Sequence, residues 1–243
     1  MKFKEPVAIN KLDSTWNGSR AVGYIEKIKR RDESGTEIIE DFVKKIERED
    51  GTISYLFQAN LRSNDTMIRL QAWSNDSNPT RAKDLANSFN DGDYVLIEGK
   101  FNEREYNEKL YREINAFKIS RTTEKENPEM FVTVQLQGII DYLDYDEQED
   151  LLKIIIKMKR YNSEEYDEYR VVGEPNNPYV NWLMNKSPAV SVGDVIKVGC
   201  DYKNEVIKDR YGEIEGIVNR LELGKIYAYG RSKDAPKKTG FGF

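Results

Sequence analysis

The sequence is 243 residues long and carries 38 Lys and Arg against 43 Asp and Glu, a formal net charge of −5. This balance excludes a uniformly basic nucleic-acid binder, but it leaves enough cations to cluster on one face. With 33% charged and 38% apolar residues, a core forms only where apolar residues alternate regularly, which favours small β-barrels over a thick α/β sandwich. The length suits one large domain or two of about 120 residues each.

The residue types exclude several kinds of chemistry. Histidine is absent and Cys200 is the one cysteine, so the chain lacks the commonest general base and can build neither a zinc site nor an internal disulfide. We expect no enzyme, no metal and no cofactor, and we interpret the acidic run 141–150 as a solvated β-turn rather than a cation site. Without a long apolar span or a signal-peptide pattern, we expect a cytoplasmic protein with no membrane partner.

The first half of the chain predicts three strands, a helix and then further strands. Strand composition occurs at 20–30, 53–61 and 66–74, and a proline-opened stretch with helical apolar spacing follows at 78–90. Gly92 and Asp93 supply a tight turn before a β-rich run at 94–99, and residues up to 119 continue as a hairpin.

The second half repeats this order. Strand-like runs at 131–143, 151–161 and 168–174 precede a proline-opened helix at 177–188, and a second Gly-Asp turn, Gly193-Asp194, lies 101 residues after the first. Five strands with a helix between the third and fourth is the order of an OB fold, a small Greek-key barrel. We therefore predict an all-β protein with short helices, made of two tandem OB-fold barrels at 1–119 and 130–228, joined by a polar linker at 120–129 and followed by a tail at 229–243. The alternative is one larger β-sandwich with two incidental helices.

The run 67–73 carries the strongest candidate site. Alternation places Ile68, Leu70 and Ala72 on a core face, whereas the opposite face carries Arg69 and Trp73 among polar neighbours. A guanidinium beside an indole suits a surface on which bases stack and phosphates are neutralised. The alternative for Trp73 is packing at the end of the barrel.

Further candidates lie on neighbouring strands. Arg104 and Tyr106 share one side of the hairpin after residue 99, although a solvated turn explains their charges equally well. Tyr55 and Phe57 alternate along a strand and belong either to the core or to the binding surface. The candidate cations that complete the set are Lys29 and Arg30 in the basic run 27–31, and Lys100 and Arg112 around the hairpin.

Residues 67–119 resemble the second half of the OB domain in bacterial and phage single-stranded DNA-binding proteins. The resemblance rests on Arg69 and Trp73 in the third strand, on Glu98-Gly99 closing the next strand, and on Arg104 and Tyr106 in the hairpin. It implies a protein that binds single-stranded DNA with little sequence preference during replication, recombination or repair, in the cytoplasm of a bacterium or of a phage-infected host. The alternative is a tandem OB-fold scaffold protein of a phage replisome or virion.

The second half and the tail depart from this family pattern. The 101-residue offset places Glu174 where Trp73 stands, so the second barrel is expected to support a dimer, to extend the DNA track through Tyr161 and Tyr202, or to dock a partner. A homo-oligomer is left open. The terminal aromatic residues Phe241 and Phe243 lie in a basic tail, where they form a docking motif for replication or recombination proteins or pack against a barrel.

Overall fold

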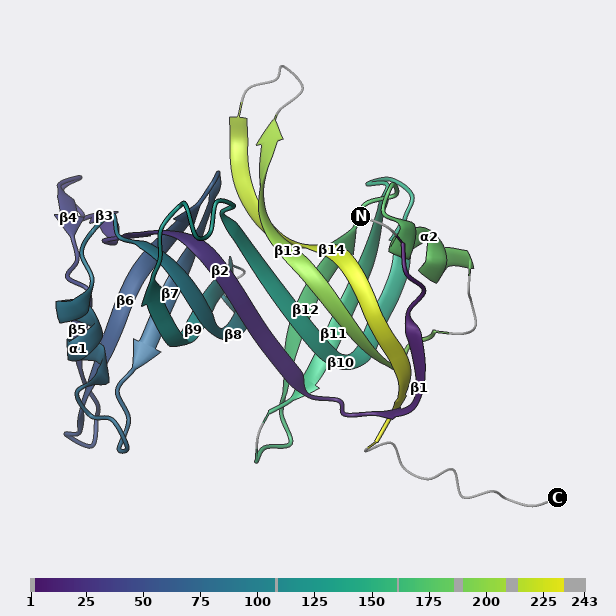
Figure 1. The fold of residues 1–243 in the computed structure, drawn as a ribbon, viewed down its shortest axis with the longest axis horizontal. Coiled ribbons are helices and arrows are strands. Elements are labelled where there is room, and N and C mark those ends of the chain that lie inside the picture. The colour runs from purple at the N-terminus through teal and green to yellow at the C-terminus, as the bar shows by residue number, and fades with distance from the viewer. Residues whose placement is uncertain (1–2, 108, 161, 186–189, 209–213, 234–243) are drawn as a thin grey trace. The chain divides into compact units, whose positions relative to one another are not determined.

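The computed structural model describes residues 3–107, 109–160, 162–185, 190–208 and 214–233, with the side chains of 205–208 and 214–217 left out. The described elements are β-strands and two short helices, α1 (Arg81–Ser88) and α2 (Pro178–Asn185) (Figure 1). The expected all-β class with short helices is confirmed. The chain divides into two compact units: unit 1 holds residues 1–17, 135–201 and 220–243, and unit 2 holds residues 18–134 and 202–219.

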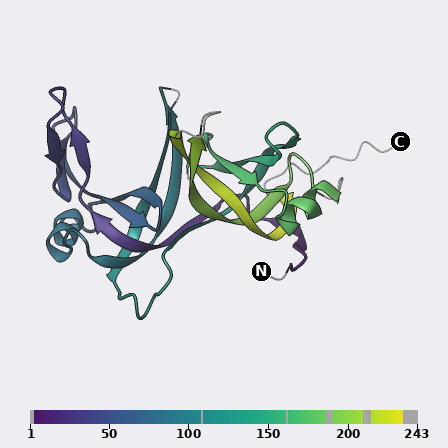
Figure 2. The same cartoon turned by 90° about the horizontal axis from the view of Figure 1, so that it is seen from above.

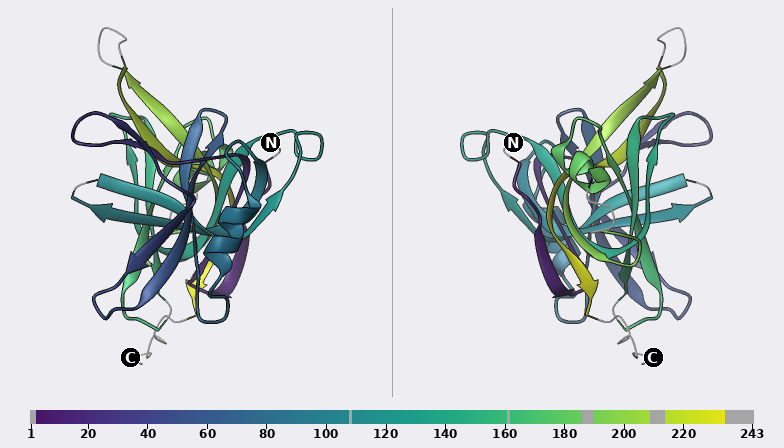
Figure 3. Two further views of the ribbon diagram at one scale, coloured as in Figure 1. Left: turned by 90° about the vertical axis from the view of Figure 1, so that its left-hand side faces the viewer. Right: turned by 90° about the vertical axis from the view of Figure 1, so that its right-hand side faces the viewer.

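The strands of unit 2 pair in a path that returns to its starting strand. β2 (Trp16–Glu26) pairs antiparallel with both β6 (Ile53–Ser63) and β8 (Tyr94–Tyr106), β6 pairs antiparallel with β7 (Thr66–Trp73), and β8 pairs antiparallel with β9 (Lys109–Arg121). A parallel pair of β7 and β9 completes the path. Helix α1 joins β7 to β8, and the β8–β9 hairpin extends outward from the other strands of the unit (Figure 3).

Three short strands lie at the margin of unit 2. β3 (Lys29–Arg31) and β4 (Glu37–Ile39) form a separate two-stranded sheet, and β5 (Val43–Glu47) pairs with β6 as an edge strand. They occupy the purple segment at the edge of the unit in Figure 2. All the residues of β3 are exposed.

The core of unit 2 follows from strand alternation. Ile68, Leu70 and Ala72 of β7 are buried, and β8 and β9 contribute further buried apolar side chains in the same way, among them Ile97, Phe101 and Ile114. β2 turns from β8 toward β6 at Gly23, where a Cβ atom would lie 2.3 Å from the carbonyl oxygen of Arg62. Only glycine permits this close approach of two backbones, so Gly23 is required for β2 to pair on both sides.

Unit 1 has the same pairing order. β10 (Phe131–Asp146) pairs antiparallel with β11 (Leu151–Lys159), which pairs antiparallel with β12 (Tyr166–Gly173), and β12 pairs in parallel with β14 (Ile214–Ser232). β13 (Val195–Lys208) pairs with both β14 and β10, so this path also returns to its first strand. Helix α2 joins β12 to β13.

The two Gly-Asp turns have matching geometry. Gly92 and Gly193 have φ angles of 88° and 94°, a left-handed region that glycine adopts without strain. The amide of Gly92 donates to the carbonyl oxygen of Ile25 at 2.7 Å, and the amide of Gly193 donates to that of Ile140 at 2.8 Å. In both turns the aspartate side chain accepts a hydrogen bond from a backbone amide three residues earlier, at 2.8 Å and 3.0 Å. The repeated sequence therefore folds into repeated local structure.

The division into units differs from the expected boundaries at both ends of the chain. Residues 1–17 belong to unit 1, because β1 (Val7–Leu12) pairs in parallel with β14 through Val7–Ala228 and Ala8–Tyr229. The same pairing corrects the tail, since residues 229–232 are part of β14. Phe241 and Phe243 lie outside the described residues.

The expected linker 120–129 is also corrected. β9 continues to Arg121, and the hydroxyl of Tyr94 donates to the carbonyl oxygen of Asn127 at 2.7 Å. Residues 202–219 join unit 2, where the rings of Phe101 and Tyr202 lie 5.9 Å apart between centroids. These contacts join segments that are far apart in sequence, so strand composition alone did not reveal them.

Cys200 provides a test of the unit 1 core. Its side chain is buried, and burial raises the pKa of the thiol because the thiolate is poorly solvated there. We expect Ellman's reagent to leave native protein unmodified at pH 8 and to modify one thiol per chain once urea unfolds it. Rapid stoichiometric modification of the native protein would contradict this packing.

Candidate nucleic-acid interface

One face of β6, β7, β9 and β8 brings together half of the predicted nucleic-acid-binding residues. The register pairs Asn60 with Arg69, Arg69 with Glu113, and Glu113 with Asn102. A second row pairs Gln58 with Gln71, Gln71 with Asn115, and Asn115 with Lys100. Paired residues of neighbouring strands share a face, and alternation adds Trp73, Arg104 and Tyr106 to the same side. We call this surface, defined by Arg69, Trp73, Lys100, Arg104 and Tyr106, the platform face.

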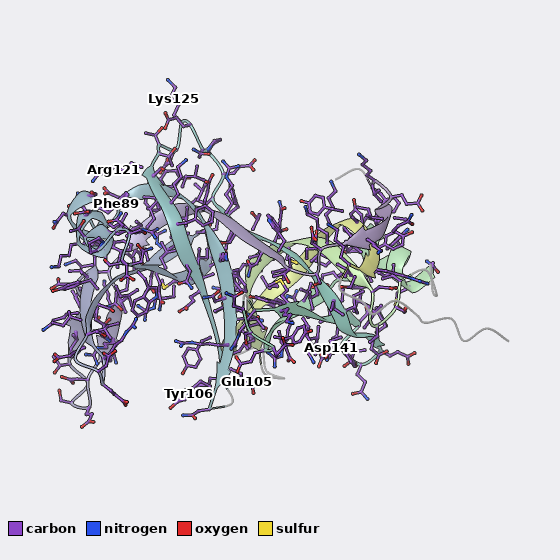
Figure 4. All side chains as sticks on the ribbon, turned by 90° about the horizontal axis from the view of Figure 1, so that it is seen from below. Phe89, Glu105, Tyr106, Arg121, Lys125 and Asp141 are labelled. Atoms are coloured by element: carbon purple, nitrogen blue, oxygen red, sulfur yellow. The ribbon has the colours of Figure 1, made fainter. Side chains whose placement is uncertain are left out.

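The aromatic side chains of the platform face are open to solvent. Trp73 is 37% exposed at the end of β7, and Tyr106 is 65% exposed near the end of the β8–β9 hairpin. Figure 4 shows Glu105 and Tyr106 near that end, well separated from Phe89 and Arg121 at the other end of the two strands. Exposed rings on a polar surface offer flat faces for base stacking.

Two exposed aromatic residues were missed by the sequence reasoning. Tyr111 pairs with Arg104 across the hairpin, and the Arg104 guanidinium lies 5.8 Å from the centre of the Tyr111 ring. Phe117 is the extra residue of a bulge in β9 opposite Glu98 and Gly99. Predicting a two-residue turn after Tyr106 would have given the strand register that pairs Tyr111 with Arg104. The bulge at Phe117 had no corresponding signal in the sequence.

The cations of the platform face differ in their surroundings. Arg69 is half-buried, and burial lowers the pKa of its guanidinium while the carboxylates of Glu40 and Glu113 oppose that shift. Its buried Nη1 atom has no hydrogen-bond acceptor among the described residues. Lys100 and Arg104 are exposed, and neither forms an ion pair with a described carboxylate. Lys100 and Arg104 are therefore available to an anionic ligand, whereas Arg69 is only partly accessible.

Two predicted aromatic residues lie on the other side of the sheet. Phe57 is fully buried, and its ring stacks on Phe42 with centroids 5.7 Å apart, so of its two expected places, core or binding surface, it occupies the core. Tyr55 shares the side of Phe57 by alternation, and the Nζ atom of Lys83 in α1 lies 3.8 Å from the centre of its ring. The structure therefore does not bring Tyr55 to the platform face.

Arg112 is a structural residue rather than a phosphate contact. Its Nε atom lies 2.6 Å from Oε2 of Glu103, with side-chain exposures of 7% for the arginine and 0% for the glutamate. Arg112 also donates to the carbonyl oxygen of Asn219. The predicted role was wrong because Glu103, nine residues earlier in the hairpin, holds the guanidinium inside the unit.

Lys29 and Arg30 lie on β3, outside the paired rows of the platform face. The structure nevertheless connects Arg30 to that face through Glu40. Nε of Arg30 lies 2.8 Å from one oxygen of Glu40, and Gln58, whose side chain is on the platform face, donates to the other oxygen at 2.8 Å. No comparable contact connects Lys29 to the platform face within the described ranges.

The corresponding strands of unit 1 carry a different surface. Lys153 forms ion pairs with Asp146 and Glu149 at 2.8 Å and 3.0 Å, and Lys157 forms ion pairs with Asp141 and Glu168. Hydrogen bonds to these carboxylates raise the pKa of both lysines. The charges of Lys153 and Lys157 are thus neutralised within the unit.

Tyr161 and Tyr202 were proposed to extend the DNA-binding surface into the second half of the chain. The structure describes only Tyr202, and its side chain is not open to a ligand. Tyr202 is buried, and burial raises the pKa of its hydroxyl to about 12; its predicted role was wrong. Tyr161 lies outside the described residues. Trp182 of α2 is buried as well.

Other kinds of site receive no support from the described side chains. No group of three or more His, Cys, Asp or Glu residues among them is placed to hold a metal ion. No helix found in those ranges is long and apolar enough to cross a membrane.

No protein-family model and no curated protein matches this sequence. Solved structures do match. A deletion variant of the single-stranded DNA-binding protein from Thermus aquaticus has a TM-score of 0.51 and 15% identity, covering 92% of this chain and 98% of that chain. The wild-type Thermus aquaticus protein has a TM-score of 0.50 and 14% identity, covering 93% and 98%. A small single-stranded DNA-binding protein from Streptomyces coelicolor matches with a TM-score of 0.28, 15% identity and coverage of 48% and 99%. The likeness to the Thermus structures is one of fold, over almost the whole of both chains.

Proposed function

We propose that this chain is a non-enzymatic protein that binds single-stranded DNA on the platform face of unit 2. The observation that carries the proposal is the strand register, which places Arg69, Trp73 and Lys100 on one open face with Arg104 and Tyr106. The fold likeness to the single-stranded DNA-binding proteins of Thermus aquaticus supports the same function. Its cellular setting, in this proposal, is replication, recombination or repair in a bacterial or phage-infected cytoplasm.

Each unit, in this proposal, is an OB-fold barrel. The support is that both units have strand pairings that return to the first strand, one parallel pair, and a helix between the third and fourth of these paired strands in chain order. In an OB fold, oligonucleotides bind across the face of the second and third strands. In unit 2 those strands are β6 and β7, which carry Gln58, Arg69 and Trp73.

Binding would combine stacking with phosphate neutralisation. A base stacked on Trp73 or Tyr106 contributes about 1–3 kcal/mol and tolerates any sequence, because every base has a π-face. Arg69, Lys100 and Arg104 would contact phosphates and release counterions from the DNA, so the affinity would fall as the salt concentration rises. The ion-paired Lys153 and Lys157 of unit 1 favour a supporting or partner-docking role for that unit. Phe241 and Phe243 are further candidates for docking replication or recombination proteins.

The test is a fluorescence anisotropy titration of a labelled, unstructured oligothymidine and of a duplex of the same length, each at low and moderate salt. We expect tight, salt-sensitive binding to the single strand and weak binding to the duplex. Failure to bind the single strand at low salt would contradict the proposal and would favour the alternative of a tandem OB-fold scaffold protein.

A further inference from the structure

Glu40 is an acidic residue held at the border of the platform face. It follows β4, and its side chain is only 22% exposed. Each of its two carboxylate oxygens has a donor: Nε of Arg30 at 2.8 Å and Nε2 of Gln58 at 2.8 Å. The carboxylate is therefore fixed from two sides, and one of these donors belongs to the platform face itself.

The same carboxylate acts on Arg69. Arg69 pairs with Asn60 of β6, which lies two residues after Gln58 on the same side of that strand. The negative charge of Glu40 favours the charged form of the Arg69 guanidinium. Nη1 of Arg69 is buried and has no acceptor among the described residues. Glu40 thus bonds the guanidinium of Arg30 directly and acts on that of Arg69 only electrostatically.

We propose that Glu40 is an intramolecular counter-ion that occupies the place of a DNA phosphate at Arg30 and Gln58, on the border of the platform face. This inference rests on the proposed function. A carboxylate and a phosphate present similar oxygens to a guanidinium, so a phosphate reaching this position competes with Glu40 for the same donors. Because Glu40 is attached to the chain, its effective concentration there is high. Glu40 therefore keeps the affinity below the value that the two arginines alone would give.

The counter-ion also predicts the salt dependence of binding. A phosphate that replaces Glu40 at an arginine already balanced by a carboxylate changes the local charge little, so that contact contributes little to counterion release. Removing the negative charge of Glu40 leaves Arg30 without its carboxylate partner and removes the negative charge that acts on Arg69. The affinity should then rise, and it should also fall more steeply with salt.

The experiment compares Glu40→Gln with Glu37→Gln in the full-length protein. Glu37 is exposed on β4 of the same hairpin, so both variants remove one negative charge from one region, but only Glu40 contacts Arg30 and Gln58. The glutamine at position 40 keeps an oxygen that can accept from Gln58. Anisotropy titrations with labelled oligothymidine at four salt concentrations give the affinity and its salt slope, and thermal unfolding checks the fold.

We expect Glu40→Gln to tighten binding about threefold to tenfold at low salt and to steepen the salt slope by about 0.7 for each arginine released. Glu37→Gln should change the affinity less than about twofold. Equal effects of the two variants would overturn the inference, and so would weaker binding by Glu40→Gln, since Glu40 would then only position its donors. Glu40→Ala with the same readouts replaces Glu40→Gln if the latter does not fold. Absence of binding by the wild-type protein is a separate outcome, which contradicts the proposed function itself.

Discussion

Replacement of Glu103 by Ala is expected to destabilise the protein by about 3–5 kcal/mol, because it leaves the Arg112 guanidinium buried without its partner. Glu103 is fully buried on the inner side of β8, 2.6 Å from Arg112. The same guanidinium also donates to the carbonyl oxygen of Asn219. Urea unfolding followed by circular dichroism measures the loss as a lower midpoint at an unchanged slope.

A double replacement provides the control for this prediction. Glu103→Leu with Arg112→Met removes both charges and keeps apolar volume, so it should recover most of the lost stability. Glu37→Gln, on the exposed hairpin, should change the stability by less than about 0.5 kcal/mol. A loss below about 1 kcal/mol in Glu103→Ala would mean that water or another group solvates Arg112 in place of the carboxylate.

The element order was predictable because each element has a local signal. Alternation identified β7 and its core face, and the prolines and Gly-Asp turns located both helices and the strands that follow them. The partner of each strand had no such signal. The parallel pair of β1 with β14 joins the two ends of the chain, and nothing in the composition of residues 7–12 indicates which strand they contact. The expected domain boundaries failed for this reason.

The site residues also divide into those with a local sequence signal and those whose surroundings depend on distant parts of the chain. Arg69 and Trp73 were predictable because the apolar residues between them define the opposite face of one strand. For Phe57 the alternation was equally clear, but it did not reveal which side of β6 is covered, and packing against Phe42 decides that. Arg112 has a charged side chain that sequence reasoning places in solvent, yet Glu103 provides a buried partner.

Glu40 shows most clearly which features of the site cannot be predicted from the sequence. Its partners Arg30 and Gln58 come from different strands, and the residues around it have the alternating charges of an exposed ribbon. The sequence places Glu40 among many similar carboxylates, and only the folded chain distinguishes it. Contacts of this kind determine how strongly a charged face binds, whereas alternation determines only which residues lie on it.

The double variant Trp73→Ala/Tyr106→Ala is expected to lose about 2–6 kcal/mol of binding to oligothymidine, a drop of at least about thirtyfold in affinity, because each ring stacks one base. The two residues lie on different strands of the platform face, so their effects should add. The salt slope should stay close to that of the wild type, since no cation is removed. The matched control is Tyr142→Ala/Tyr166→Ala, which removes two exposed tyrosines from unit 1 and should change the affinity by less than about twofold if stacking is confined to unit 2. Equal losses in the two double variants would show instead that the DNA path also crosses unit 1, and an unchanged affinity in the first would remove the platform face from the mechanism.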